Sequence, residues 1–396
     1  CGHFPKTHLK VLLGAHWEPP RCRGILRLLS TLMTKDTQNR DGRTIAETLE
    51  GIGGYFVPFS SLDSFGIDLE GLSPEMDRAV PILEEALTKP LFDEFVFERE
   101  KNAQLAAIRD ELDDIFNVSF RHVRKMFFGR HPYAVGPMGT EETVRTIQRS
   151  DVLDAVEHRV VGRNLVFSVV TSHPFESVVS WLCPLAEKIS DQPLSPIHRN
   201  TEVFLKNKGA ETKTLYLGRE QALVLKAYPA CGRRHNDFYS HEVVEEWLNG
   251  PSSEFIVRVR EKLGLSYQVG ATYWAGLERG MFCLFAGTHE SHVARIEEEM
   301  CRVMDRLRRG EVAVGEFESA VVRLKVRHRT RMQSMGKRAA EAGFNVIYGL
   351  TERDVYEDRL NEVTADAIVS VSNRCFTEDG TCTVRASSLK KRPLSH

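Results

Sequence analysis

One order of predicted elements occurs twice along the chain, and this internal duplication constrains the fold more than any other feature of the sequence. In the first half we expect a helix from 44 to the stop at Gly53-Gly54, strands over 55–59 and 65–69, a helix from 73 and a charged helix over 93–112. From 237 onward we expect helices over 238–248 and 254–262, strands over 267–273 and 281–287, a helix over 292–307 and a charged helix over 316–332. Each half ends with a capped helix followed by a strand, and we expect these two strands over 165–170 and 381–386.

The mixture of amphipathic helices and short strands predicts an α+β fold made of two duplicated domains. We expect each domain to be a mixed, mostly antiparallel sheet with helices packed on one face. The domains are predicted to cover residues 1–190 and 197–396, joined by a linker around 191–196, where prolines and serines gather. The length of 396 residues fits two domains of ordinary size.

Neither charge nor hydropathy points to nucleic acid or to a membrane. The formal net charge is −2 and the sequence pI is about 6.8, so no overall field attracts a polyanion. No apolar run approaches the ~20 residues that span a bilayer, so we expect no transmembrane segment. The eight cysteines show no C-x-x-C spacing and are predicted to be mostly reduced thiols in the core.

Five stretches, in order along nearly the whole chain, carry a resemblance to a known family. They are Gly24-Ile-Leu-Arg-Leu-Leu-Ser-Thr-Leu-Met-Thr-Lys-Asp-Thr37, Ile45-Ala-Glu-Thr-Leu-Glu-Gly-Ile-Gly-Gly54, Lys89-Pro-Leu-Phe-Asp-Glu-Phe-Val-Phe-Glu-Arg-Glu100, His131-Pro-Tyr133 with Gly136 and Gly139, and Leu263-Gly-Leu-Ser-Tyr-Gln-Val269. Together they resemble the pitrilysin/insulinase family of zinc metallopeptidases, which are inverzincins. The resemblance implies peptide-bond hydrolysis at a zinc site between two similar halves.

The zinc motif of that family is degenerate in this chain. Laid on the first stretch, the pattern H-x-x-E-H places its histidines on Arg27 and Thr31 and its glutamate on Ser30. The third ligand, a glutamate further along, falls on Ala107 or its neighbour Ile108. Zinc needs several neutral or anionic donors, whereas Arg27 is a fixed cation and Ala107 offers no donor. We therefore expect this chain to bind no metal, and we expect the zinc in a partner half or subunit.

The resemblance also implies a second functional element. In these enzymes one half carries the zinc, and the other carries an arginine and a tyrosine seven residues apart. Arg260 and Tyr267 match that pair in the context Arg-Glu-Lys-Leu-Gly-Leu-Ser-Tyr. A tyrosine hydroxyl can donate to a developing oxyanion, and a guanidinium can hold a substrate carbonyl. By resemblance, Arg260 and Tyr267 support catalysis at the zinc site of the partner.

Two functions from different classes follow. The first is a zinc-free subunit or C-terminal half of a pitrilysin/insulinase-type metallopeptidase, inactive alone, that helps to enclose a peptide substrate in a heterodimer. Peptides in this family bind by adding a strand to a sheet edge, which either domain could offer. The alternative is a non-catalytic core subunit of a larger complex, similar to the core proteins of the respiratory cytochrome complex. A zinc peptidase acting alone would need a site that the sequence does not show.

Three other clusters have simpler interpretations. His289 and His292 flank a predicted helix start, where capping is favoured over metal binding. His241 and Glu245 lie one helical turn apart and are predicted to form part of an ion-pairing surface. The basic run over 323–332 has no interleaved aromatic residues, which favours a solvated helix face over contact with an acidic partner.

Overall fold

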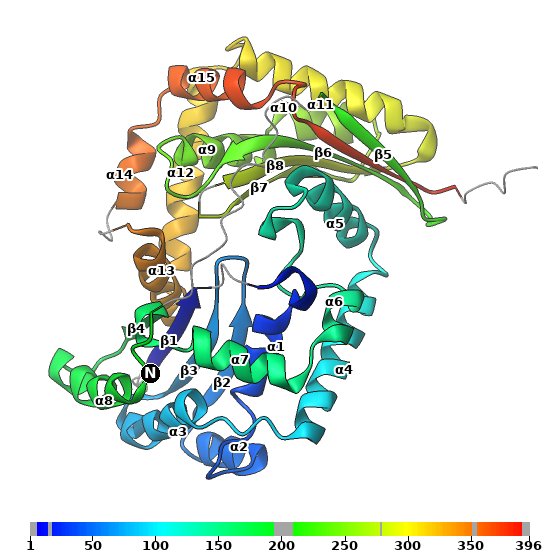
Figure 1. Cartoon of the computed structure of the whole chain (residues 1–396). Helices are drawn as coiled ribbons and strands as arrows, with labels where there is room; N and C mark the ends of the chain where they lie inside the picture. Colours follow the sequence, from blue (N-terminus) through cyan, green and yellow to red (C-terminus); the bar gives the residue numbers. More distant parts are fainter. Residues whose placement is uncertain (1–5, 15–17, 194–208, 278, 351–354, 390–396) are drawn as a thin grey trace, which may run out of the picture. The chain divides into compact units, whose positions relative to one another are not determined.

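The computed structural model describes residues 6–14, 18–193, 209–277, 279–350 and 355–389. The chain divides into two compact units, each with one sheet (Figure 1). The first unit comprises Cys1–Asp110, Val135–Arg199 and Thr330–Thr351, and the second comprises Glu111–Ala134, Asn200–Arg329 and Glu352–His396. The predicted α+β class is confirmed. Each unit contains a segment from the other half of the sequence, and the proposed sequence domains 1–190 and 197–396 stay a prediction.

The first unit has a four-stranded antiparallel sheet in the order β2-β3-β1-β4. Its strands are β1 (Lys6–Gly14), β2 (Tyr55–Ser60), β3 (Ser64–Leu72) and β4 (Leu165–Val170). Because successive side chains of a strand point to opposite faces, Leu9, Val11 and Leu13 enter the main core while Leu12 faces the other side. The predicted strand boundaries agree within a few residues, and β4 agrees at both ends.

Helices of the first unit cover the face that carries Leu9. They are η1 (Pro20–Cys22), α1 (Ile25–Leu32), α2 (Gly42–Gly51), η2 (Ser73–Glu75), α3 (Met76–Thr88), α4 (Glu94–Glu111), α6 (Glu141–Thr146), α7 (Arg149–Arg159), η4 (Gly162–Asn164) and α8 (Phe175–Lys188). The core joins apolar residues of α1 to α4 to the odd-numbered residues of β1. α3 continues through Pro81. The 3-10 turn η2 before it begins at Ser73, where the helix was predicted to start, but Leu72 is the N-cap and Ser73 does not cap the turn.

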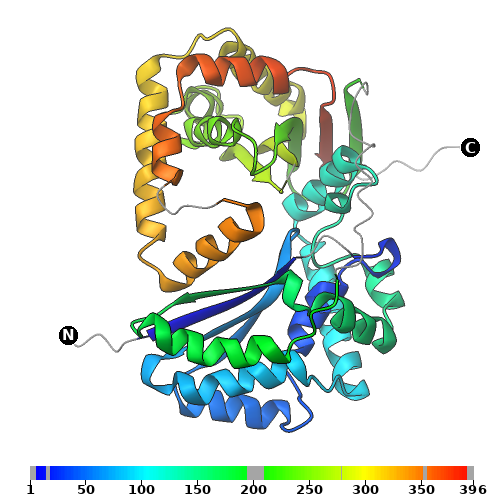
Figure 2. The ribbon, with the colours of Figure 1, turned by 60° about the vertical axis from the view of Figure 1, so that its left-hand side comes forward.

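One helix from the second half of the sequence covers the opposite face of this sheet. Helix α13 (Met335–Tyr348) contacts β1 and β4 (Figure 2). The Ser168 hydroxyl donates to the carbonyl of Ala339 at 2.7 Å. At Gly343 an added Cβ would lie 2.4 Å from a methyl carbon of the buried Leu12, so any larger residue would force Leu12 or α13 to shift. The sheet is therefore covered on both faces.

The close approach at Gly343 gives a first test. Gly343→Ala should lower the midpoint of urea unfolding, corresponding to about 1–3 kcal/mol, because the new methyl group overpacks a contact with little free space. Gly51→Ala is the matched control, since Gly51 ends α2 with no atom within 4 Å of an added Cβ. It should leave stability unchanged or raise it slightly. Equal midpoints for the two variants would contradict this account of α13.

The second unit has a five-stranded sheet in the order β5-β9-β6-β8-β7. Its strands are β5 (Glu211–Tyr216), β6 (Ala222–Cys231), β7 (Gln268–Ala275), β8 (Arg279–Thr288) and β9 (Cys382–Ser387). β5 and β9 are parallel and the other pairs are antiparallel, so this sheet is mixed as predicted. The helical segments are α5 (Ile115–Phe128), η3 (Pro132–Ala134), α9 (Phe238–Asn249), α10 (Glu254–Ile256), η5 (Val257–Lys262), η6 (Glu290–His292), α11 (Val293–Arg308), α12 (Val314–Arg331), α14 (Val355–Asn361) and α15 (Ala365–Cys375).

α5 is the counterpart of α13 in the second unit. It comes from the first half of the sequence and contacts β6 and β9. Phe116 of α5 packs edge-on against Phe285 of β8, with ring centroids 5.2 Å apart. Phe285 lies on the opposite face of β8 from Phe282 and Leu284, which belong to the main core. Both sheets are thus covered on their second face by a helix that the other sequence half supplies.

Two further properties bear on the predictions from composition. Among the described residues, no helix combines the length and the apolar character needed to cross a bilayer. Seven cysteines lie in the described part of the chain and all are free. Cys22, Cys283 and Cys382 are buried as predicted, whereas Cys183 of α8 is exposed.

Candidate functional site

The start of α1 is built by a close crossing of two glycines. Gly24 adopts a left-handed conformation with φ of 96°, and Gly139 approaches it so closely that an added Cβ would lie 2.2 Å from the carbonyl oxygen of Arg23. The Glu18 carboxylate accepts the backbone N–H groups of Gly24 and Leu26 at 3.1 and 3.0 Å. Burial raises the pKa of Glu18 to about 7, although these hydrogen bonds oppose the shift. The degenerate zinc motif is therefore held on a rigid helix.

The side chains at the zinc-motif positions are engaged with main-chain carbonyls. Arg27 donates from Nη1 to the carbonyl oxygen of Pro58 in β2 at 3.3 Å. The hydroxyls of Ser30 and Thr31 donate to the carbonyl oxygen of Arg27 at 2.9 and 3.1 Å, within α1 itself. One face of α1 thus presents a guanidinium and two hydroxyls where the family motif has two imidazoles and a carboxylate.

The third zinc position lies on α4 and supplies no donor. α4 lies beside the start of α1, since Gln104 donates to the carbonyls of Gly24 and Met138 at 3.0 and 2.9 Å. Ala107 and Ile108 follow one turn later, and Ile108 is fully buried in the core. Among the described residues, no three His, Cys, Asp or Glu side chains converge as metal ligands. These residues do not fit zinc, because they offer no set of neutral or anionic donors that converges on one ion.

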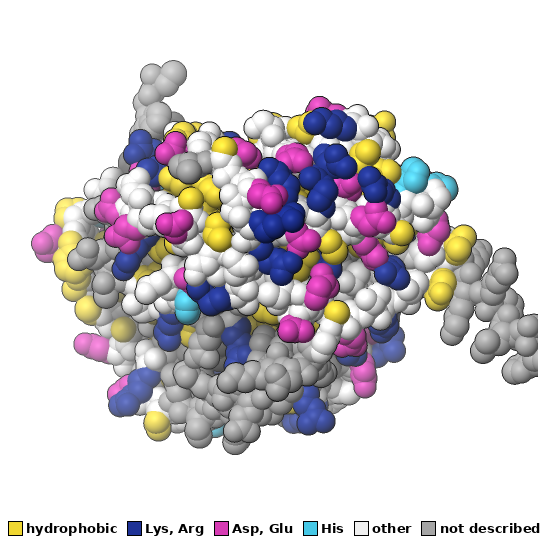
Figure 3. Space-filling model, turned by 90° about the horizontal axis from the view of Figure 1, so that it is seen from above, with side chains coloured by type: hydrophobic (Ala, Val, Ile, Leu, Met, Phe, Trp, Pro, Cys, Tyr) yellow, Lys and Arg dark blue, Asp and Glu magenta, His cyan; other side chains and the backbone are white. Residues whose placement is uncertain are grey.

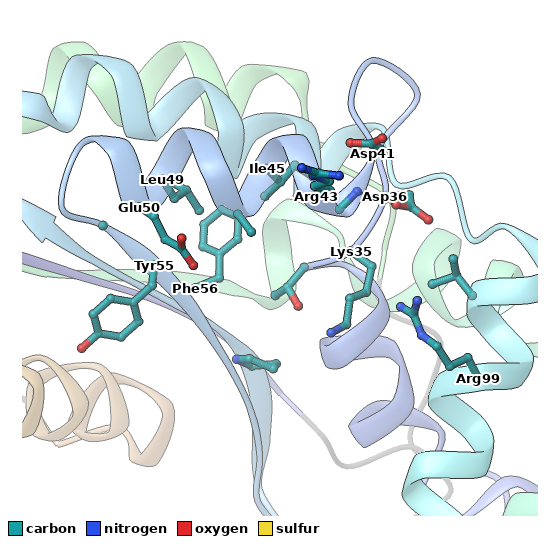
Figure 4. A pocket seen from close by; sticks show the side chains of 16 residues that line it. Lys35, Asp36, Asp41, Arg43, Ile45, Leu49, Glu50, Tyr55, Phe56 and Arg99 are labelled. Atoms are coloured by element: carbon teal, nitrogen blue, oxygen red, sulfur yellow. Dashed lines mark hydrogen bonds between the residues drawn. The ribbon is translucent and has the colours of Figure 1, made fainter.

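A pocket of about 530 Å³ lies beside β2 (Figure 4). It is lined by parts of β2, α2, α4 and the turn after α1. Lys35 and Arg99 border it, and both pair with Glu100, at 3.6 and 2.9 Å. Asp41 also borders it and accepts the N–H of Thr44 at 2.7 Å as the N-cap of α2. These charged groups of the pocket wall are therefore engaged by neighbours in the chain.

Arg260 and Tyr267 are exposed at the junction of η5 and β7. η5 is a six-residue π-helix, an arrangement found often at functional sites, and Gly264 ends the turn with φ of 59°. Tyr267 is 89% exposed. Within the described part of the chain, the side chains of Arg260 and Tyr267 form no hydrogen bond and no ion pair. Arg258 in the same helix instead forms a two-point pair with buried Glu299, at 2.6 and 3.1 Å.

The prediction that His241 forms part of an ion-pairing surface is wrong. His241 is buried, and its Nδ1 lies 2.9 Å from the carbonyl oxygen of Asp237, while its ring stacks on Tyr273 with centroids 5.0 Å apart. Burial lowers the pKa of His241 to about 4, so the ring is neutral. The apolar periodicity of α9, with Val243, Val244 and Trp247, was the signal that this face enters the core.

Sequence reasoning also missed how α9 holds the strand β7. The Asn249 amide donates to the carbonyl oxygen of Ala271 at 2.9 Å and accepts its N–H at 2.8 Å. Glu245, one turn earlier, accepts the N–H of Tyr273 at 3.0 Å. Gly270 permits this approach, because an added Cβ would lie 2.8 Å from the Asn249 oxygen. A glycine inside a predicted strand was the available signal for such a contact.

The other predicted clusters have structural partners. His289 caps η6 by accepting the N–H of Ser291 at 3.3 Å, which confirms the capping interpretation. In the basic run, Arg323 donates to the carboxylate of buried Glu246 at 2.8 Å, and Arg327 pairs with the same carboxylate. Arg323 and Arg327 thus form an ion-pair site with Glu246 inside the unit, while Arg327, Arg329 and Arg331 are exposed, as a solvated helix face predicts. Basic and acidic side chains are interspersed on the face seen in Figure 3.

Comparison with known proteins assigns the family. Residues 2–141 match the family model described as Insulinase (Peptidase family M16), and residues 146–324 match Peptidase M16 inactive domain. This chain belongs to the M16 family of peptidases. The resemblance to pitrilysin/insulinase enzymes is thereby confirmed. The degenerate positions from Arg27 to Ala107 fall in the first match, and Arg260 and Tyr267 fall in the inactive-domain match.

Full-length relatives of this M16 chain carry peptidase names. An "Uncharacterized zinc protease YmxG" of Bacillus subtilis is 23% identical over 92% of this chain and 89% of its own length. The "Mitochondrial-processing peptidase subunit beta" of Saccharomyces cerevisiae is 22% identical over 91% of this chain and 81% of its own length. The solved structure of a peptidase M16 inactive domain from Pseudomonas fluorescens has a TM-score of 0.87 at 18% identity, covering 99% of this chain and 95% of that one. The last comparison shows the shared fold.

The partly buried Glu245 gives a pH-dependent prediction. Burial raises its pKa from 4.5 to about 7, so its contribution to stability is present below pH 4.5 and is lost as the pH rises through 7. Glu245→Gln keeps the acceptor for Tyr273 and removes the titration. Relative to the original chain, the variant should gain roughly 2–3 kcal/mol between pH 4.5 and 8, at about 1.4 kcal/mol per pKa unit.

Urea unfolding across this pH range measures the effect. The exposed Glu50→Gln serves as the control and should show no such gain. A difference between Glu245→Gln and the original chain that stays constant with pH would contradict the raised pKa.

Proposed function

We propose that this chain is the zinc-free member of a paired M16 peptidase, which helps to enclose an extended peptide and contributes Arg260 and Tyr267 to the zinc site of a partner half or subunit. The observation that carries the proposal is the exposure of both side chains without a partner in the described structure. The family match supports it, since both residues lie in the inactive-domain segment. The residues at Arg27, Ser30 and Thr31 support it as well, because they cannot replace zinc ligands.

The chemistry of the two side chains suits this role. The Tyr267 hydroxyl can donate a hydrogen bond to the oxyanion that forms at the scissile carbonyl. The planar guanidinium of Arg260 can hold a substrate carbonyl through two parallel donors. Such interactions are weak in water and strengthen where water is excluded, so these exposed groups would act only once a partner and a peptide cover them.

The zinc is assigned to the partner. Relatives of similar length are named zinc proteases, and one is named as a subunit of a processing peptidase. A zinc ion, when bound there, would polarise the substrate carbonyl and activate the attacking water. The residues of this chain would orient the peptide and stabilise the negative charge.

The isolated chain provides a direct test. After dialysis it should contain no stoichiometric zinc and should not hydrolyse peptides, because the positions Arg27, Ser30, Thr31 and Ala107 provide no ligand set. Elemental analysis and a peptide-cleavage assay measure both properties. One zinc per chain together with chelator-sensitive cleavage would overturn the proposal, once a contaminating peptidase is excluded by repeating the assay on a second purification.

The complex with a zinc-bearing partner tests the two side chains. Tyr267→Phe should lower kcat about a hundredfold, or ~3 kcal/mol, with little change in KM, because the lost donor acts on charge present only in the transition state. Arg260→Lys should lower kcat and also raise KM, since it holds the ground-state peptide too. Tyr216→Phe, another exposed tyrosine, is the control and should be neutral.

The same experiment distinguishes the alternative function. If both variants cleave peptide at the original rate while the partner retains its zinc, Arg260 and Tyr267 have no catalytic role. The chain would then be better described as a structural core subunit of a larger complex. Assembly with the partner, measured by size-exclusion chromatography, separates a loss of activity from a loss of association.

A further inference from the structure

We infer that α1 in the first unit and α9 in the second unit seal the adjacent sheet edges, so that this chain holds no extended peptide at β2 or at β7. Arg27 with Pro58 closes the edge of β2, and Asn249 with Glu245 closes the edge of β7. The inference rests on and deepens the proposed function, because it assigns the peptide backbone to the partner and leaves side-chain contacts to this chain.

The outer edge of β2 lacks its central hydrogen-bonding groups. Ser61 donates its N–H to the carbonyl of Ser64 across the turn, so alternate residues Phe56, Pro58 and Ser60 direct their main-chain groups away from β3. Pro58, in the middle, has no N–H. Its carbonyl oxygen is occupied by the Arg27 guanidinium at 3.3 Å. A peptide strand aligned here would find no donor at the central position, and it would have to compete with Arg27 for the acceptor.

The outer edge of β7 is closed by different chemistry. β7 pairs with β8 on one side only, so it is an edge strand. The Asn249 amide satisfies both the N–H and the carbonyl of Ala271, as a neighbouring strand would. The carboxyl group of Glu245 accepts the N–H of Tyr273, the next outward-facing residue. These groups are therefore satisfied before any peptide arrives.

At β2, pairing with a peptide is prevented by the lack of main-chain hydrogen-bonding groups and not by a lack of room. The pocket of about 530 Å³ opens beside Tyr55, Phe56 and Pro58, so side chains of a bound segment would have room (Figure 4). Strand addition gains its affinity from main-chain hydrogen bonds, and a missing central pair removes much of that gain. An exposed edge also invites pairing with a second copy, which proline and a charged side chain are known to prevent.

Amide hydrogen exchange of the original chain tests the assignment without any substitution. The N–H groups of Ala271 and Tyr273 should exchange slowly although they lie on an outer edge, whereas those of Phe56 and Ser60 should exchange quickly. Rapid exchange at Ala271 and Tyr273 would overturn the seal at β7. The proposal also excludes pairing of a peptide strand with β2. Slower amide exchange at Phe56 and Ser60 after addition of an unstructured Val/Thr-rich peptide of about twelve residues would therefore overturn the seal at β2.

A variant in which the edge of β2 is open provides a second test, in which peptide binding should increase. The double variant Arg27→Leu with Pro58→Ala frees the acceptor and restores the donor. It should bind the same labelled peptide at least tenfold more tightly than the original chain by fluorescence anisotropy, and a peptide N-methylated at alternate residues should lose the gain. Arg43→Leu is the control, since Arg43 borders the same pocket and pairs only with Glu47 in the described structure.

Each outcome of this experiment is decisive. A folded double variant that gains no affinity, or an original chain that binds the plain peptide but not the N-methylated one, overturns the inference. If the double variant does not fold, Pro58→Ala alone and Asn249→Ala repeat the measurement at the two edges. All arms use the isolated chain and report binding, whereas the proposed function is tested by kcat in the complex, so failure of one is distinguishable from failure of the other.

Discussion

Each sheet of this chain has two apolar faces, and the helices of its own sequence half cover only one of them. The remaining face is covered by α13 in the first unit and by α5 in the second. At Gly343 the contact is so close that a single methyl group would collide with Leu12. Because an uncovered apolar sheet face is unfavourable in water, neither sheet is complete without the other half of the sequence. The duplication therefore produces two similar units that depend on each other's chain segments.

The helices α1 and α9 occupy equivalent places in the two units, each beside the edge strand of its sheet. α1 directs Arg27 to the main chain of β2, and α9 directs Asn249 and Glu245 to the main chain of β7. In both cases a polar side chain of the helix satisfies groups that an edge strand would leave open.

The local elements could be predicted from the sequence because local signals specify them. Both ends of strand β4 were predicted, and the helix start after Thr364 follows from capping. At Ser73 the turn begins where predicted, but Leu72 is its N-cap and no side chain caps it. The placement of α5 and α13 could not be predicted, since nothing in their own sequences states which sheet they cover. His241 was misassigned for a related reason: its burial depends on Tyr273 and on other residues far along the chain. The degenerate zinc positions came from the family resemblance, and the contact of Arg27 with Pro58 required the structure.

Arg258 and Arg260 lie in the same short π-helix, but only the side chain of Arg258 has a partner in the described structure. Arg258 is paired with a buried carboxylate, so its charge belongs to the unit itself. Arg260 and the largely exposed Tyr267 have no partner in the described structure, so they add nothing visible to its stability. A π-helix is a less stable geometry than an α-helix, and its retention beside two unpaired polar side chains fits a role outside the unit. Catalysis that needs these groups would then depend on assembly, since a pair of exposed donors can stabilise an oxyanion only after a partner excludes the water around them.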